Sequence, residues 1–145
     1  MYANVEEISE KFFEKIRDDI RRKASEGRSK YSTYLQINPN LETPKVYQNM
    51  KNHKEVSMIG RLRTSSHNLH VEMGRRNGTA REKRLCACRN AVEDEEHFLT
   101  KCLMYSDIRQ KHDVYNVNVD TILNDEKYIE YIIDLYERRK LVAAL

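Results

Sequence analysis

Three cysteines and one histidine stand close together in this sequence, and both residue types bind metal ions. Cys86, Cys88, His97 and Cys102 follow the spacing C-x-C-x8-H-x4-C and include every cysteine of the 145-residue chain. Three thiolates and one imidazole form the Cys3His ligand set that tetrahedral structural zinc sites use. In such a site the free energy of metal binding adds to the free energy of folding. The segment therefore predicts a structural zinc site with these four residues as ligands.

The alternative is that these residues are three reduced thiols and an ordinary histidine. One residue separates Cys86 from Cys88, where two to four are usual, and Arg89 stands where a glycine often helps the chain to turn. In a continuous α-helix His97 and Cys102 would lie about 140° apart around the axis, so a helix carrying both ligands must end or bend between them. A disulfide framework is a poorer interpretation, because three cysteines cannot all pair within one chain and the N-terminal residues do not resemble a signal peptide.

A basic block precedes and overlaps the cysteine segment. Residues 60–90 contain eight Lys and Arg against two acids, although the net charge of the whole chain is only +3. Within this block, residues 74–84 (GRRNGTAREKR) have almost no apolar side chain and predict an exposed basic loop. Cations on such a loop can contact the phosphates of RNA or DNA, although a solvated surface loop explains them nearly as well. The candidate nucleic-acid-binding residues are Arg61, Arg63, Arg75, Arg76, Arg81, Lys83 and Arg84.

The segments on either side predict helices that would hold this module. Residues 4–27 read as a helix with Asn4 as its N-cap and an apolar stripe that is most simply a packing face. Residues 126–145 predict a second strong helix, whereas residues 67–73 (HNLHVEM) predict a short extended piece. The expected fold is mainly α, one helical domain over residues 1–145 with an irregular zinc-knuckle-like module at residues 84–102. The apolar side chains expected on the second helix are Tyr128, Ile129, Ile132, Ile133, Tyr136 and Leu141.

Three segments in this order, residues 60–76, 81–102 and 103–112, resemble a known family. They read GRLRTSSHNLHVEMGRR, REKRLCACRNAVEDEEHFLTKC and LMYSDIRQKH. They are similar to the region beyond the polymerase domain of non-LTR (LINE-type) retrotransposon reverse transcriptase proteins. The resemblance implies that Cys86, Cys88, His97 and Cys102 are the knuckle ligands. It also implies that the region engages nucleic acid beside the polymerase as an accessory. The single residue Ala87 is a departure, because the family pattern has two residues between the first cysteines.

The sequence lacks the catalytic motifs of polymerases and nucleases, and also those of P-loop enzymes and serine hydrolases. It contains no Tyr-x-Asp-Asp polymerase turn, no nuclease-type Pro-Asp with a spaced Asp/Glu-x-Lys, no phosphate-binding P-loop and no Gly-x-Ser-x-Gly elbow. A thiolate nucleophile formed by Cys102 with His97 or His112 has only proximity in the sequence to support it. No stretch has the ~18 apolar residues of a membrane span. The chain is therefore expected to have no catalytic residues and no membrane partner.

Two functions from different classes remain. The first is a non-catalytic accessory domain of an intracellular, nuclear protein, which binds the backbone of RNA or DNA and holds zinc for structural reasons. The second is a helical protein-interaction or dimerisation domain, a decayed or adopted retroelement fragment without metal. In that second case the two terminal helices would form a homodimer or dock another domain of a parent polyprotein.

Overall fold

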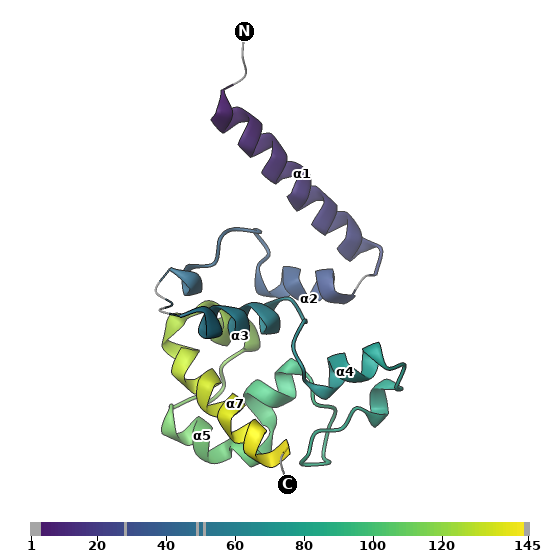
Figure 1. Ribbon diagram of the computed structural model, residues 1–145, viewed down its shortest axis with the longest axis vertical. Coiled ribbons are helices and arrows are strands. Elements are labelled where there is room, and N and C mark those ends of the chain that lie inside the picture. Colours follow the sequence, from purple (N-terminus) through teal and green to yellow (C-terminus); the bar gives the residue numbers. More distant parts are fainter. Residues whose placement is uncertain (1–3, 28, 49, 51, 144–145) are drawn as a thin grey trace.

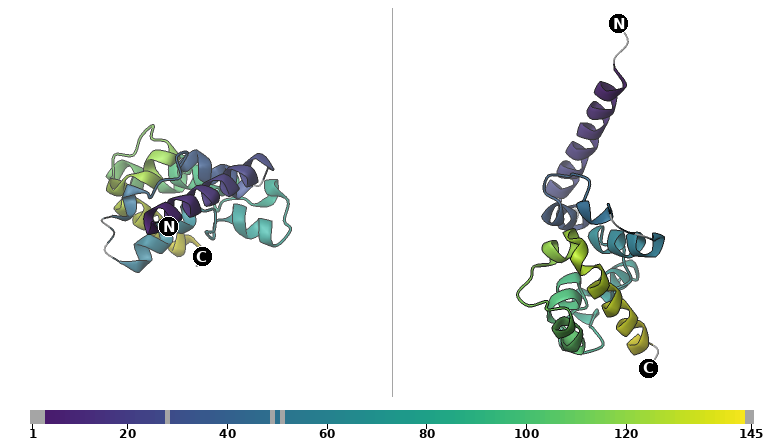
Figure 2. Two further views of the ribbon diagram at one scale, coloured as in Figure 1. Left: turned by 90° about the horizontal axis from the view of Figure 1, so that it is seen from above. Right: turned by 90° about the vertical axis from the view of Figure 1, so that its left-hand side faces the viewer.

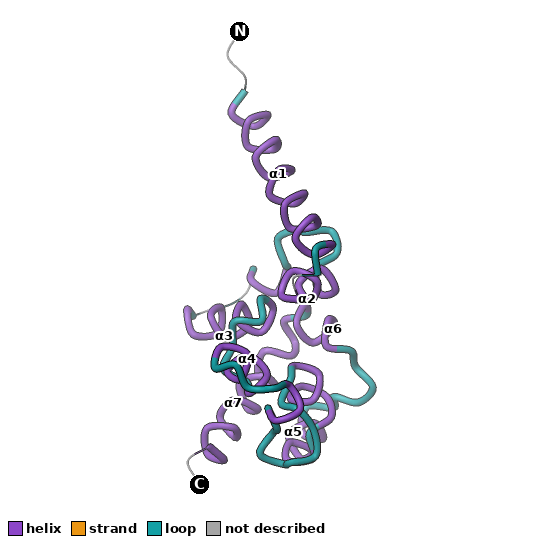
Figure 3. Tube along the Cα trace, turned by 90° about the vertical axis from the view of Figure 1, so that its right-hand side faces the viewer, coloured by secondary structure: helices purple, strands orange, loops and turns teal. Residues whose placement is uncertain are grey.

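The protein is mainly α-helical, as the sequence predicts. The computed structural model describes residues 4–27, 29–48, 50 and 52–143 (Figure 1). In these residues there is no β-strand, and one isolated antiparallel bridge joins Leu85 to Val92 (Figure 3). The α-helices are α1 (Val5–Ser25), α2 (Ser29–Ile37), α3 (His53–Arg63), α4 (His70–Arg76), α5 (Ser106–Lys111), α6 (Val119–Asn124) and α7 (Ile129–Ala143). The shorter turns are η1 (Lys45–Tyr47), η2 (Arg81–Lys83), η4 (Leu103–Tyr105), η5 (Glu126–Tyr128) and the π-helical turn η3 (His97–Lys101).

The hydrophobic core lies where α3, α5, α6, α7 and the π-helical turn meet. The ring of Phe98 is at its centre and packs edge-on against Tyr105 and Tyr136, with ring centroids 5.4 and 5.2 Å apart. Such edge-to-face pairs contribute beyond the area that they bury. The side chains with no exposed surface include Ile59, Leu62, Leu69, Leu99, Ile122, Leu123, Tyr131, Ile132 and Leu135. Because η3 carries His97 and is followed directly by Cys102, this core fixes one half of the cysteine segment.

Helix α7 and the turn η5 before it bury much of the apolar set that the sequence predicts: Tyr128 and Ile132 are buried, and Ile129 and Tyr136 pack against the core. Tyr131, Ile132 and Leu135 are fully buried, whereas Leu141, expected on the buried face, is 68% exposed. Residues three and four apart share a helix face, so Tyr131, Ile132 and Leu135 form one stripe. Leu141 lies in the last turns of α7, beyond the core (Figure 1). The expectation for Leu141 was wrong, because apolar residues occur all around this helix and only tertiary packing selects one side.

Helix α4 occupies a segment for which an extended conformation was expected. The residue before it, Leu69, has no side chain that can cap the helix. Instead, the carboxylate of Glu93 accepts a hydrogen bond from the amide of His70 at 2.8 Å, and the backbone carbonyl of Glu93 accepts one from the amide of Val71 at 3.1 Å. These amides belong to the first helical turn, which has no acceptor within the helix. The cap thus comes from a residue 23 positions away, which is why local sequence did not reveal the helix.

Helix α1 projects from the rest of the molecule and contacts chiefly α2 (Figure 2). The Asn4 side chain accepts a hydrogen bond from the amide of Glu6 at 3.3 Å, so the predicted N-cap is present. However, none of the residues of α1 is buried. Its apolar stripe, predicted as a packing face, is exposed in this structure. In the described part of the chain, no helix is long and apolar enough to cross a membrane.

Candidate metal centre

A short hairpin presents the first two candidate ligands. Its two sides are joined by the amide of Cys86, which donates to the carbonyl of Ala91 at 2.9 Å, and by the Leu85–Val92 bridge. The amide of Arg89 donates to the carbonyl of Cys86 at 2.8 Å and closes the turn. Arg89 has a φ of 60°, in the left-handed region where glycine is the usual residue. Arg89 therefore takes the conformation for which a knuckle glycine was expected.

A turn of π-helix presents the other two ligands. Asp94 opens this segment, because its side chain accepts from the amide of His97 at 2.9 Å and its carbonyl accepts from the amide of Phe98 at 2.9 Å. The turn ends where the amide of Cys102 donates to the carbonyl of His97 at 2.8 Å. This bond spans five residues, whereas an α-helical bond spans four. The wider turn returns Cys102 to the side of His97 and removes the angular separation that an α-helix would impose.

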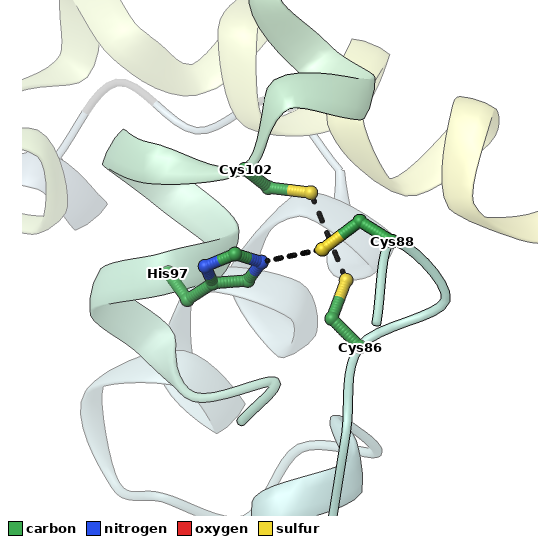
Figure 4. Close-up of side chains that lie close together, drawn as sticks. All are labelled: Cys86, Cys88, His97 and Cys102. Atoms are coloured by element: carbon green, nitrogen blue, oxygen red, sulfur yellow. Dashed lines mark hydrogen bonds between the residues drawn. The ribbon is translucent and has the colours of Figure 1, made fainter. Parts of the chain in front are cut away.

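The four side chains meet in one place (Figure 4). The sulfur atoms of Cys86 and Cys102 are 3.7 Å apart, and the Cys88 sulfur is 3.2 Å from Nε2 of His97. All four potential ligand atoms lie within 4.8 Å of one another, and none of the thiols forms a disulfide. Cys86, His97 and Cys102 are buried and Cys88 is half-buried. The arrangement is compatible with a metal site, and each half of the segment supplies two of its possible ligands.

Burial shapes the acid–base properties of this cluster. Removal from solvent raises the pKa of Cys86 to about 12 and raises the pKa of Cys102 as well. For Cys88, burial also acts upward, but hydrogen bonds from the backbone of Asn90 and from the other thiols outweigh it and lower the pKa. Burial lowers the pKa of His97, which favours the neutral imidazole that binds metals. In the metal-free protein two of the thiols thus keep their protons at neutral pH, and a cation must displace them to bind.

A buried ion pair attaches the hairpin to α7. The guanidinium of Arg139 donates from Nε to one oxygen of Glu93 at 2.7 Å and from Nη2 to the other at 2.9 Å. Arg139 also donates to the carbonyl of Asn68 at 3.0 Å, beside the start of α4. Burial acts to raise the pKa of Glu93, but the hydrogen bonds and charge of Arg139 prevail and lower it. The sequence offered no signal for this pair, because Arg139 stands in the basic last turns of a helix, where cations are common.

Arg63 and Arg84, both predicted to bind nucleic acid, hydrogen-bond to backbone carbonyls of the folded body. Arg63 is 1% exposed and donates to the carbonyl of Leu123 at 2.7 Å, one of the unsatisfied carbonyls at the end of α6. The guanidinium of Arg84 donates to the carbonyls of Val71 and Thr79 at 2.6 to 2.9 Å. Its side chain lies so close to Gly74 that a Cβ there would be 2.5 Å from it. The placement of Arg63 in a phosphate-binding surface was wrong.

The other predicted cations are at the surface or half-buried. Arg75 pairs with Glu72, and Arg81 pairs with Asp94 at 2.9 Å. Arg61, Arg76 and Lys83 are exposed. Arg76 donates weakly to the carbonyl of His67 at 3.3 Å. Residues 74–84 are therefore only partly a loop: residues 74–76 form the end of α4 and residues 81–83 form η2.

Comparison with protein-family models, with curated protein sequences and with solved structures finds no match to this chain. The resemblance to retrotransposon proteins stays a prediction from the quoted motifs.

Proposed function

We propose that this chain binds one zinc ion through Cys86, Cys88, His97 and Cys102, and that the ion has a structural role. The proposal is carried by the convergence of four possible ligand atoms within 4.8 Å. A tetrahedral zinc site with usual bond lengths has sulfur–sulfur edges of about 3.8 Å and sulfur–nitrogen edges of about 3.6 Å. The observed separations of 3.7 and 3.2 Å are close to these edges. Shifts of about 1 Å in side-chain position complete the tetrahedron.

A structural role follows from the number of ligands and their burial. Catalytic zinc sites keep one coordination position open for water, whereas four protein ligands close the site. Here three of the four are buried and the fourth is half-buried. When bound, the ion supplies a cross-link between the hairpin and the π-helical turn. Cys86 and Cys88 would hold the hairpin side, and His97 and Cys102 would hold the π-helical turn.

We further propose that the surface beside this centre binds the phosphate backbone of RNA or DNA as a non-catalytic accessory. Three exposed cations support this part of the proposal: Arg76 at the end of α4, Lys83 on η2 and Arg89 at the tip of the hairpin. Among the described residues, no carboxylate lies within ion-pair distance of these three side chains. Arg89 was not among the predicted residues, because the turn that exposes it was not foreseen. Free cations of this kind release counterions from phosphates, so binding would be strongly salt-dependent.

The zinc proposal is tested by metal content and thermal melting. We expect one zinc per chain by plasma mass spectrometry, and a lower melting temperature after treatment with a strong chelator. The variant His97→Ala should lose the zinc. The matched control is His53→Ala, because His53 is exposed on α3, outside the cluster. A metal-free wild-type protein whose melting does not respond to chelator or to added zinc would refute the proposal.

The nucleic-acid proposal is tested separately by fluorescence polarisation with single-stranded RNA and duplex DNA at low salt. The triple variant Arg76→Gln, Lys83→Gln and Arg89→Gln should weaken binding and make the logarithmic salt slope shallower by about two to three. The control removes the same charge elsewhere, by replacing the exposed Lys111, Lys127 and Lys140 with glutamine. Equal affinities of the two triple variants would reject this surface, whatever the result for zinc.

A further inference from the structure

Helix α1 carries an apolar stripe that is exposed and that the metal centre does not explain. Helix α1 is 21 residues long, about 31 Å, and stands clear of the body (Figures 1 and 2). The exposed fractions of its large apolar side chains are 79% for Val5, 56% for Ile8, 61% for Phe12, 51% for Phe13 and 41% for Ile16. Together these side chains expose roughly 500 Å², as much apolar surface as the largest patch of a typical monomer. Such a face indicates an interaction surface.

The body of the same chain does not cover this face. The helix ends at Ser25, and Gly27, with a φ of 77°, turns the chain toward α2. Ser32 on α2 donates to the carbonyl of Ala24 at 3.3 Å, and the Lys23 ammonium lies 5.3 Å from the centre of the Tyr31 ring. These contacts hold the C-terminal end of α1 against α2. Residues 5–16, which carry most of the stripe, extend away from the body.

The charges of α1 point to its partner. Residues 5–14 carry four carboxylates and one lysine, whereas residues 15–25 carry five cations and two carboxylates. One half of the helix is therefore acidic and the other basic, with no net charge overall. A membrane-surface helix would need a predominantly cationic polar face. A neutral helix with separated charges is instead complementary to a second copy of itself that runs in the opposite direction.

We propose that two copies of this chain associate through their α1 helices in antiparallel orientation. With the overlap centred near Glu14, Phe12 of each helix lies opposite Ile16 of the other, and Ile8 lies opposite Ile20. In this arrangement the acidic half of each α1, residues 5–14, lies beside the basic half of the other, residues 15–25.

The buried area is sufficient for a stable pair. Two copies of the stripe bury about 1,000 Å² of apolar surface, and the stems of the flanking Glu, Lys and Arg side chains add to this. The total reaches the lower part of the range for specific interfaces, about 1,200–2,000 Å². Because each α1 joins its body at its C-terminal end, the two bodies lie at opposite ends of the helix pair, about 30 Å apart. The proposal does not depend on the metal centre or on nucleic-acid binding.

The test is sedimentation equilibrium of the full chain from low to several hundred micromolar concentration. We expect a reversible monomer–dimer equilibrium with a micromolar dissociation constant. Phe12→Glu places a charge in the stripe and should weaken association by about a hundredfold or more. The control Glu14→Gln, on the side of the helix opposite the stripe, should change the dissociation constant by less than about twofold. A monomeric wild-type protein, or a dimer that Phe12→Glu does not affect, would overturn the proposal. So would a monomer that binds anionic phosphatidylserine vesicles through α1.

Orientation is tested by neutralising part of the acidic half. The double variant Glu6→Gln with Glu10→Gln removes attraction between the acidic half of one α1 and the basic half of the other, and should weaken an antiparallel dimer about threefold. In a parallel dimer the two acidic halves would face each other, so the same change would relieve repulsion and strengthen association. A stronger dimer would therefore overturn the antiparallel arrangement.

Discussion

The cysteine segment and helix α1 are built in opposite ways. The cysteine segment takes its shape from distant residues: Glu93 caps α4, Arg139 holds Glu93, and a π-helical turn aligns His97 with Cys102. Helix α1 takes its shape from itself, with its own N-cap and a series of ion pairs within the helix. Yet the first region places Cys86, Glu93, His97, Phe98, Leu99 and Cys102 in the interior, and the second has no buried residue. Strong local signals for a helix in the sequence therefore do not indicate whether that helix packs into the folded body.

Removing the proposed zinc should give the largest effect, and it should affect only one of the two regions. Structural zinc stabilises small domains by several kcal/mol, because its ligands converge only in the folded state. In the zinc-free protein we expect amide hydrogen exchange to accelerate strongly in residues 84–102. It should also accelerate in α4, because Glu93 accepts the hydrogen bonds of its first amides. Exchange in α1 should not change, because its hydrogen bonds are internal to the helix. Uniform acceleration along the whole chain would show that the two regions are not independent.

The Glu93–Arg139 pair should give the next largest effect. Replacing Arg139 by Met leaves a carboxylate whose side chain is 3% exposed without its cation, which costs about 3–5 kcal/mol in the free energy of unfolding. Urea denaturation measures this loss. The double variant Glu93→Gln with Arg139→Met removes the buried charge and should recover more than half of it. If the double variant is no more stable than the single one, the pair is not coupled.

The same pair should make stability depend on pH. In the folded protein the pKa of Glu93 is lowered, so its contribution is complete above its unfolded pKa of about 4.3 and is lost as the pH falls through the folded value. The difference in stability between wild type and Arg139→Met should therefore shrink below about pH 4.3. A difference that stays constant down to pH 3 would contradict a role for the ionised carboxylate.

The sequence specified the ligand types but not the backbone that presents them. The four candidate ligands follow from their residue types and from their confinement to one short segment. The warning that a helix must bend between His97 and Cys102 was also sound, because η3 is a π-helical turn. The features that the sequence did not reveal depend on tertiary contacts: the cap that Glu93 gives α4, and the hydrogen bond that buries Arg63 against the carbonyl of Leu123 on α6. In each case the partner is tens of residues away and no local pattern marks it.

Arg89 should give a smaller effect of opposite sign. Its φ of 60° costs a residue with a Cβ about 1 kcal/mol relative to glycine. Arg89→Gly should therefore stabilise the protein by about 0.4–1 kcal/mol in chemical denaturation. Arg89→Ala is the matched control, because it removes the same charge but keeps the Cβ, and it should give no gain. Equal stabilities of the two variants would mean that the hairpin holds Arg89 without strain.

The smallest effect is expected in α1, where it sharpens the contrast with the cysteine segment. Ile8→Ser removes an apolar side chain that is 56% exposed, so little hydrophobic stabilisation of the monomer is lost. At concentrations well below the dimer dissociation constant, the free energy of unfolding of the body should change by less than about 0.5 kcal/mol. The equivalent change in the core, Ile132→Ser, removes a fully buried side chain and should cost more than about 3 kcal/mol. A large loss from Ile8→Ser in the dilute monomer would mean that the stripe packs on its own chain in solution. In that case helix α1 would be part of the body, and the face proposed for a second copy would already be occupied.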